Sequence, residues 1–65
     1  MNLMCKEDSY KLKVGQKYKV VSINYAKLDC YKNEILRVLL YHGGLIEIHC
    51  LSLEDFNRRF IITES

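Results

Sequence analysis

The stretch that decides the fold is ILRVLLYHGGLIEIHC, residues 35–50. Two runs rich in aliphatic and β-branched side chains flank a pair of glycines, a pattern typical of a β-hairpin. A loop of the two glycines alone would mix apolar and charged side chains on both faces of the hairpin. A three-residue loop, His42-Gly43-Gly44, separates them, because a shift of one residue exchanges the faces of a strand. We therefore predict the three-residue loop, with Gly44 in the left-handed region.

This register assigns every side chain of the hairpin to one of two faces. The predicted inner face consists of Leu36, Val38, Leu40, Ile46, Ile48 and Cys50. The predicted outer face, which we interpret as the partner-binding surface, consists of Arg37, Leu39, Tyr41, Leu45, Glu47 and His49. Aromatic and apolar side chains beside arginine are typical of binding hot spots. Two alternatives stay open: another segment of the chain covers this face, or the face binds a second copy and makes a homodimer.

The sequence before the hairpin contains a second strand pattern. Residues 12–23 alternate apolar side chains with lysines, which predicts a half-buried strand. Gly15 interrupts the alternation and predicts a tight turn or a bulge. The alternation changes phase near Val21 and Ser22, which predicts a β-bulge or a sharp bend there.

The remaining segments are predicted from weaker signals. Residues 1–11 show no sustained period and are interpreted as a loose arm or an edge segment, and residues 24–33 as a long hairpin loop with Tyr25 and Tyr31 along its stem. After the hairpin, Ser52 is a predicted helix N-cap, and Asp55 stands in part for the acidic residue of a capping box.

The helical turn that follows is predicted to place its apolar side chains, Leu53, Phe56 and Phe60, on one side. Residues 60–63 are predicted to form the last strand.

This order of elements resembles the SH3-like small barrels of bacteria and bacteriophages. The resemblance rests on VGQKYKV at residues 14–20, on the hairpin of residues 34–50 and on LSLEDF at residues 51–56. It implies a mostly β fold: a barrel of about five strands over residues 12–63, with a short helical turn before the last strand. Residues 1–65 are expected to be a single domain. The closest rival is a five-stranded OB-type barrel, which usually needs more residues.

Length and composition limit the classes of function. The chain has 65 residues, of which 49% are hydrophobic and 28% charged, with a net charge of +2. These values are typical of a folded domain, and the length is too small for a nucleotide-binding βαβ pair. No apolar run approaches the ~20 residues of a membrane span. The first ten residues lack the pattern of a secretory signal, so we expect no membrane partner and a cytoplasmic protein.

The cysteines and histidines do not predict a reaction site. Cys5, Cys30 and Cys50 are odd in number and widely spaced, which favours free thiols in a reducing compartment. His42 and His49 do not complete a metal-binding spacing with them. No nucleophile, base and orienting group can be assembled from the sequence. We therefore predict no cofactor, no metal and no enzymatic activity.

A basic segment supports an alternative function, the binding of nucleic acid. It consists of Lys11, Lys13, Lys17 and Lys19 with Tyr18 between the last two. Small barrels bind single strands through basic surfaces with stacked aromatic side chains. The competing interpretation is that alternating lysines keep the exposed face of a strand soluble.

The favoured hypothesis is a non-enzymatic barrel that acts by binding a protein. If the chain comes from a phage, as its size and its resemblance suggest, it is expected to inhibit a host or defence protein by masking a surface, as anti-CRISPR-type inhibitors do.

Overall fold

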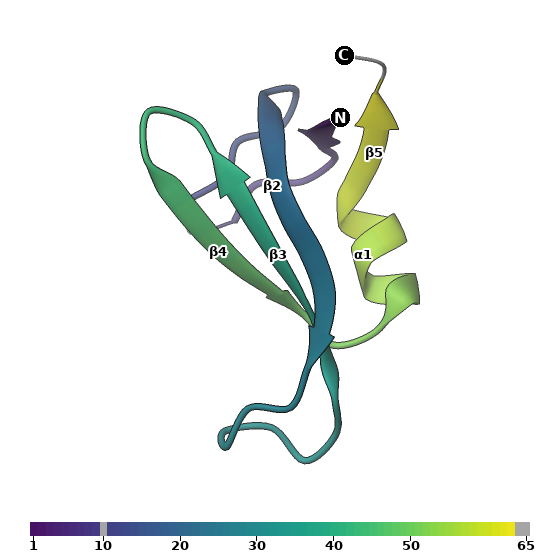
Figure 1. The fold of residues 1–65 in the computed structure, drawn as a ribbon. Helices are drawn as coiled ribbons and strands as arrows, with labels where there is room; N and C mark the ends of the chain where they lie inside the picture. Colours follow the sequence, from purple (N-terminus) through teal and green to yellow (C-terminus); the bar gives the residue numbers. More distant parts are fainter. Residues whose placement is uncertain (10, 64–65) are drawn as a thin grey trace.

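A computed structural model describes residues 1–9 and 11–63. Within these residues the chain forms five strands and one helix: β1 (Asn2–Cys5), β2 (Lys17–Ala26), β3 (Ile35–Tyr41), β4 (Leu45–Cys50), α1 (Leu53–Arg59) and β5 (Phe60–Thr63). The strands make one antiparallel sheet in the order β4-β3-β2-β1-β5 (Figure 1). The predicted mostly β fold, with a short helix before the last strand, is confirmed.

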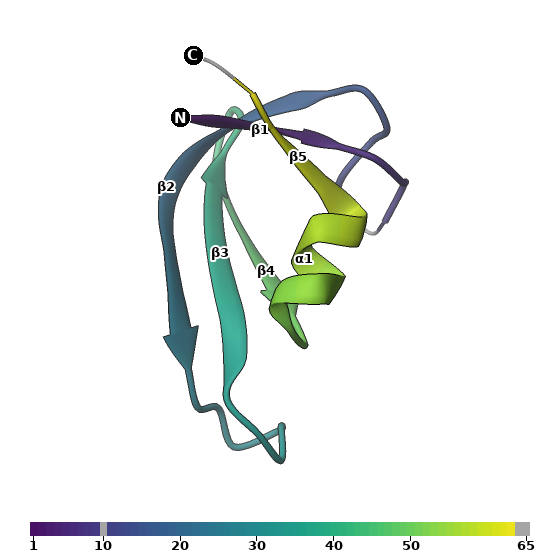
Figure 2. The same ribbon diagram turned by 90° about the vertical axis from the view of Figure 1, so that its right-hand side faces the viewer.

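The sheet is strongly curled. β1 and β5 lie side by side as an antiparallel pair near the first residues of β2, and β5 and α1 lie on the same side of the β2-β3-β4 portion (Figure 2). β4 and β5 are the two edges of the sheet, and no pairing joins them among the described residues. The sheet is therefore not closed into a barrel in this structure.

The core lies between the inner face of the curled sheet and α1. Its buried residues come from every element: Leu3, Cys5, Leu12, Tyr18, Leu36, Val38, Leu40, Cys50, Phe56 and Phe60. Val38, Leu40 and Cys50 of the central hairpin are fully buried. Because removal of a buried leucine costs about 2–5 kcal/mol, much of the stability of this small chain depends on these contacts.

The predicted hairpin register is confirmed. Tyr41 lies opposite Leu45 and Val38 lies opposite Ile48, so the loop consists of residues 42–44. Val38 is fully buried, whereas Arg37 and Glu47 are exposed. Ile48 is only half-buried because it lies on the edge strand, where no further strand covers it.

The loop glycine with the left-handed backbone is Gly43, at φ 70°, and not Gly44. The prediction for Gly44 was wrong because the loop is not the expected type I turn with a bulge. Instead, the N–H of His42 donates to the carbonyl oxygen of Gly44 at 3.0 Å, which continues the strand pairing up to a single residue. That residue, Gly43, reverses the chain.

We expect Gly43→Ala to lower the free energy of unfolding by about 1–2 kcal/mol, the cost of a left-handed backbone for a residue with a Cβ. Gly44→Ala is the matched control, with an expected change below about 0.5 kcal/mol. An added Cβ meets no atom within 4 Å at either position, so the two variants differ in backbone strain alone. Urea unfolding followed by circular dichroism measures both, and equal losses would contradict the assignment.

The strand predicted for residues 12–23 begins only at Lys17. Gly15, at φ 83°, sits in a turn closed by a 3.1 Å hydrogen bond from the N–H of Gln16 to the carbonyl oxygen of Lys13. Of the two predictions for Gly15, the tight turn is confirmed. The β-bulge is also confirmed, because the pairing of β2 with β3 shifts between Val20 and Ser22.

The first residues do not form a loose arm. β1 lies inside the sheet, between β2 and β5, and Leu3 is fully buried. Four residues are too few to show a period of two, so the sequence pattern does not reveal this strand. Its position depends on partners far along the chain, Lys19 on one side of Asn2 and Thr63 on the other.

The loop before the hairpin is shorter than predicted, because β2 continues to Ala26. Tyr25 therefore lies in the strand with 59% of its surface exposed, while Tyr31 packs its ring edge-on against His49.

The predicted helix N-cap is confirmed, since Ser52 Oγ accepts from the N–H of Asp55 at 3.1 Å. Asp55 reaches back to the N–H of Leu51, at 3.1 Å, in place of the N–H of the cap itself. Leu53 was expected to face the core with Phe56 and Phe60 but is 54% exposed.

Candidate interaction surface

The outer face of the hairpin is a continuous surface across β2, β3 and β4. Its first row is Lys19, Tyr41 and Leu45, which are paired across the three strands. Tyr41 is 50% exposed and Leu45 65% exposed. Since α1 and β5 lie on the inner side, the described part of the chain leaves this face open (Figure 2). The alternative that another segment covers it is not supported.

The β-bulge adds an apolar residue that the sequence interpretation did not assign to this surface. Val21 is the extra residue between the pairs that Val20 and Ser22 make with β3, and it is 51% exposed. Val21, Leu39, Tyr41 and Leu45 together are called the outer patch below. The signal that could have found Val21 was the change of phase that predicted the bulge.

The rest of the outer face is polar and internally paired. Arg37 Nη2 donates to Glu47 Oε1 at 2.7 Å, and His49 Nε2 lies 2.7 Å from Glu47 Oε2. On its other side, His49 Nδ1 lies 3.2 Å from the hydroxyl oxygen of Tyr31. The hydrogen bonds from Arg37 and then from His49 lower the pKa of Glu47. These polar side chains already bond one another, so Arg37 is engaged within the chain. The outer patch is therefore the part of this face that we expect a partner to contact.

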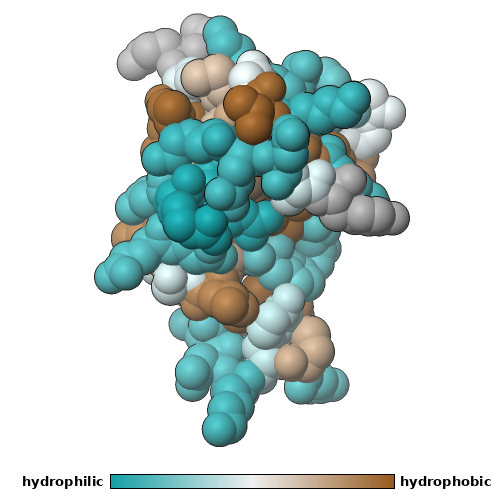
Figure 3. Space-filling view, turned by 180° about the vertical axis from the view of Figure 1, so that it is seen from behind, coloured by the Kyte–Doolittle hydropathy of each residue, from teal (hydrophilic) through white to brown (hydrophobic). Residues whose placement is uncertain are grey.

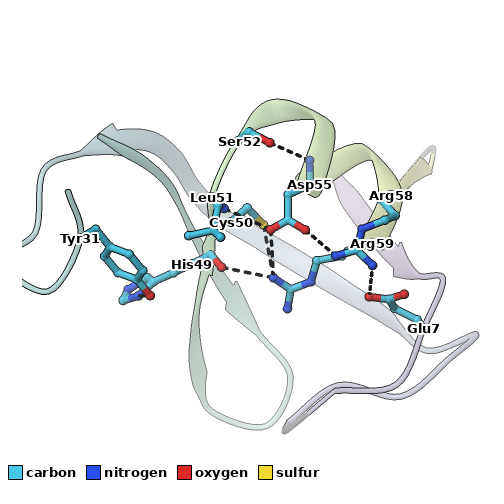
Figure 4. A network of polar contacts seen from close by, with 9 residues as sticks. All are labelled: Glu7, Tyr31, His49, Cys50, Leu51, Ser52, Asp55, Arg58 and Arg59. Carbon is cyan, nitrogen blue, oxygen red and sulfur yellow. Dashed lines mark hydrogen bonds and ion pairs between the residues drawn. The ribbon is translucent and has the colours of Figure 1, made fainter. Parts of the chain in front are cut away.

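A second polar network connects β4 to α1 (Figure 4). Arg59 Nη1 donates to the carbonyl oxygen of His49 at 3.2 Å and lies 3.7 Å from Asp55 Oδ2. Arg58 joins Asp55 to Glu7, with contacts of 2.6 and 2.8 Å. Partial burial raises the pKa of Asp55, but hydrogen bonds from Arg58 and from the N–H of Leu51 outweigh it, and the net pKa is lowered. This network holds β4, α1 and the segment around Glu7 together.

The predicted nucleic-acid surface is not assembled as expected. Tyr18 is 3% exposed, its hydroxyl accepts from the N–H of Lys13 at 3.1 Å, and its ring lies edge-on to His42. Tyr18 is therefore not available to stack on a base. Lys17 and Lys19 are exposed on β2, whereas Lys11 and Lys13 lie outside the named strands.

The described residues contain no group of three metal-ligating side chains. Cys5 and Cys50 are buried, which raises the pKa of both thiols, and Cys30 is exposed.

A shallow pocket of about 210 Å³ lies beside the loop between β2 and β3, lined by Tyr31, Lys32, Asn33, Glu34, Ile35 and Leu51. Seen from behind, hydrophilic side chains cover most of the surface, and apolar ones form separate patches (Figure 3). No helix among the described residues is long and apolar enough to cross a membrane.

The chain matches no protein-family model, no curated protein and no solved structure. Its function is therefore inferred from its own residues.

Proposed function

We propose that the protein is a non-enzymatic module that binds another protein through the outer patch. The observation that carries this proposal is the exposure of Tyr41 and Leu45 side by side at the loop end of the hairpin. Tyrosine buries a large apolar area at a low cost in rotamer entropy and keeps a hydroxyl for a polar group of the partner. Lys19 beside Tyr41 favours a partner with acidic groups at the edge of its site.

The mode of action that we propose is masking of a surface on the partner. The described part of this 65-residue chain assembles no group of catalytic side chains, which supports action by occupancy. The strand order, and the helix between β4 and β5, support a relationship to SH3-like small barrels in which the last closing pairs are missing. With that resemblance, inhibition of a host or defence protein is the form of masking that we favour.

The test is to identify the partner by photo-crosslinking and then to measure its affinity. A benzophenone amino acid at position 45 captures whatever contacts the outer patch in the producing cells. Binding of the purified partner is then measured by calorimetry. We expect Tyr41→Ala to weaken binding about 5- to 150-fold, which corresponds to about 1–3 kcal/mol for an interface anchor.

Tyr25→Ala is the matched control, because Tyr25 is similarly exposed but lies far from the outer patch on β2. It should leave the affinity unchanged, and both variants should keep the wild-type circular dichroism spectrum. Equal effects of the two variants would contradict the proposal. Binding of a single-stranded oligonucleotide that falls steeply with salt and is insensitive to Tyr41→Ala would favour the nucleic-acid alternative.

A further inference from the structure

The free edge of β4 has a defined set of unpaired backbone groups. In an antiparallel ladder, residue pairs alternate between hydrogen-bonded and non-hydrogen-bonded. The bond from the N–H of His42 to Gly44 fixes the phase, so Leu40 with Ile46 and Val38 with Ile48 are the hydrogen-bonded pairs. The backbones of Leu45, Glu47 and His49 therefore face away from β3. In this phase the carbonyl oxygen of His49 points away from β3, and Arg59 donates to it from that side.

Arg59 occupies only one end of this edge. It takes the carbonyl oxygen of His49, and among residues 1–9 and 11–63 nothing else takes the outward N–H and C=O groups of Leu45 and Glu47. Exposed edges are usually protected by charged side chains, especially lysine, by proline, by a bulge or by short length. β4 has six residues, none of them lysine or proline, and its acidic side chain, Glu47, is held by Arg37 and His49. The other edge, β5, has four residues, and the N–H of Phe60 is already bonded to Phe56.

We propose that this open edge binds β4 of a second copy of the chain, antiparallel, about a two-fold axis at Ile46. In this register Leu45 lies opposite Glu47 of the second copy, and Glu47 lies opposite its Leu45. The open N–H and C=O groups of both residues are then satisfied by one another. Ile46 lies opposite Ile46 of the second copy, on the inner face, where it is half-buried in the single chain.

The other registers are disfavoured by charge or by groups already used. An axis at Glu47 places the two Glu47 carboxylates opposite each other, which is destabilising. An axis at Ile48 requires the carbonyl oxygen of His49, which Arg59 holds. An axis at Leu45 places Glu47 opposite Gly43, whose backbone is left-handed and not extended. The pairing at Ile46 uses only the open groups of Leu45 and Glu47, and it ends where His49, whose carbonyl oxygen is held by Arg59, comes opposite Gly43 of the second copy.

This inference does not rest on the proposed function, because it uses backbone groups of the edge rather than the side chains of the outer patch. The dimer places Leu45, the most exposed of the patch residues, beside the second copy. The homodimer that the sequence left open is thereby assigned to an edge, not to the face.

Disulfide trapping tests the register. In a Cys30→Ser background, which removes the exposed thiol, Ile46→Cys and Ile48→Cys are compared under mild oxidation. In the proposed dimer the two residues 46 form a non-hydrogen-bonded pair, with Cα atoms about 4.5 Å apart, which suits a disulfide. The two residues 48 are roughly 13 Å apart. We expect Ile46→Cys to form linked dimers at least tenfold faster than Ile48→Cys.

Sedimentation measures the association without oxidation. The wild-type chain should show a concentration-dependent monomer–dimer equilibrium. N-methylation of the Glu47 amide, introduced by chemical synthesis, removes an N–H that the dimer uses. It should raise the dissociation constant of the dimer at least tenfold, while the pairing with β3 and the circular dichroism spectrum are retained. A wild-type chain that is monomeric at millimolar concentration, or faster trapping through Ile48→Cys, would overturn the proposal. A monomer that still binds its partner through Tyr41 would leave the proposed function intact.

Discussion

Leu40→Ala should lower the free energy of unfolding by about 2–5 kcal/mol, while Leu39→Ala should lower it by less than about 1 kcal/mol. The two leucines are adjacent on β3 but face opposite sides of the sheet. Leu40 is fully buried in the core, whereas Leu39 is half-buried on the outer face opposite Glu47. Small domains have only about 5–15 kcal/mol of total stability, so the Leu40 variant should lose a large part of it.

Urea unfolding followed by far-ultraviolet circular dichroism measures both changes, and the same denaturant dependence in both variants would show that they share one unfolding transition. A larger loss for Leu39→Ala would mean that the faces of the hairpin are exchanged. Equal losses would mean that the outer face is covered in solution.

The features that the sequence predicted correctly are those that depend on neighbours in the chain. The hairpin register follows from segregation of apolar side chains, the bulge from the change of phase at Val21, and the helix cap from Ser52. β1 was missed because its four residues show no pattern and are held by partners that lie far away in sequence. The barrel was predicted from the order of elements, but closure depends on whether β4 and β5 meet in space.

The candidate site was predicted to the same extent. The placement of the six predicted residues on one face follows from the register. The contact of Tyr31 with His49 joins residues 18 apart and leaves no local signal. Tyr18 was assigned to a nucleic-acid surface, but the alternation that exposes Lys17 and Lys19 itself directs Tyr18 inward. The role of Arg59 was not predictable, because no periodicity distinguishes it from Arg58.

Arg59→Ala is expected to lower the free energy of unfolding by about 2–3 kcal/mol, and Arg58→Ala by less than about 1 kcal/mol. Arg59 is 17% exposed and binds the edge of β4 and Asp55 at once. Hydrogen bonds that involve a charged group contribute about 1.5–3 kcal/mol, and the alanine variant leaves the His49 carbonyl and part of the Asp55 carboxylate without their donor. Arg58 is 60% exposed, and ion pairs at such a position contribute little.

Urea unfolding at low and high salt distinguishes the two arginines. The loss for Arg59→Ala should persist at 1 M salt because the contact with the His49 carbonyl is a partly buried hydrogen bond, while the small loss for Arg58→Ala should disappear as salt screens the exposed pairs. If Arg58→Ala lowered the free energy of unfolding as much as Arg59→Ala, the ion pairs of Arg58 with Glu7 and Asp55 would hold the helix in place. The hydrogen bond from Arg59 to β4 would then not be the main contact. The hydrogen bond from Arg59 to the His49 carbonyl also keeps the end of the β4 edge from pairing with another strand. Once Arg59 is removed, the carbonyl oxygen of His49 becomes available, and trapping through Ile48→Cys should increase relative to Ile46→Cys.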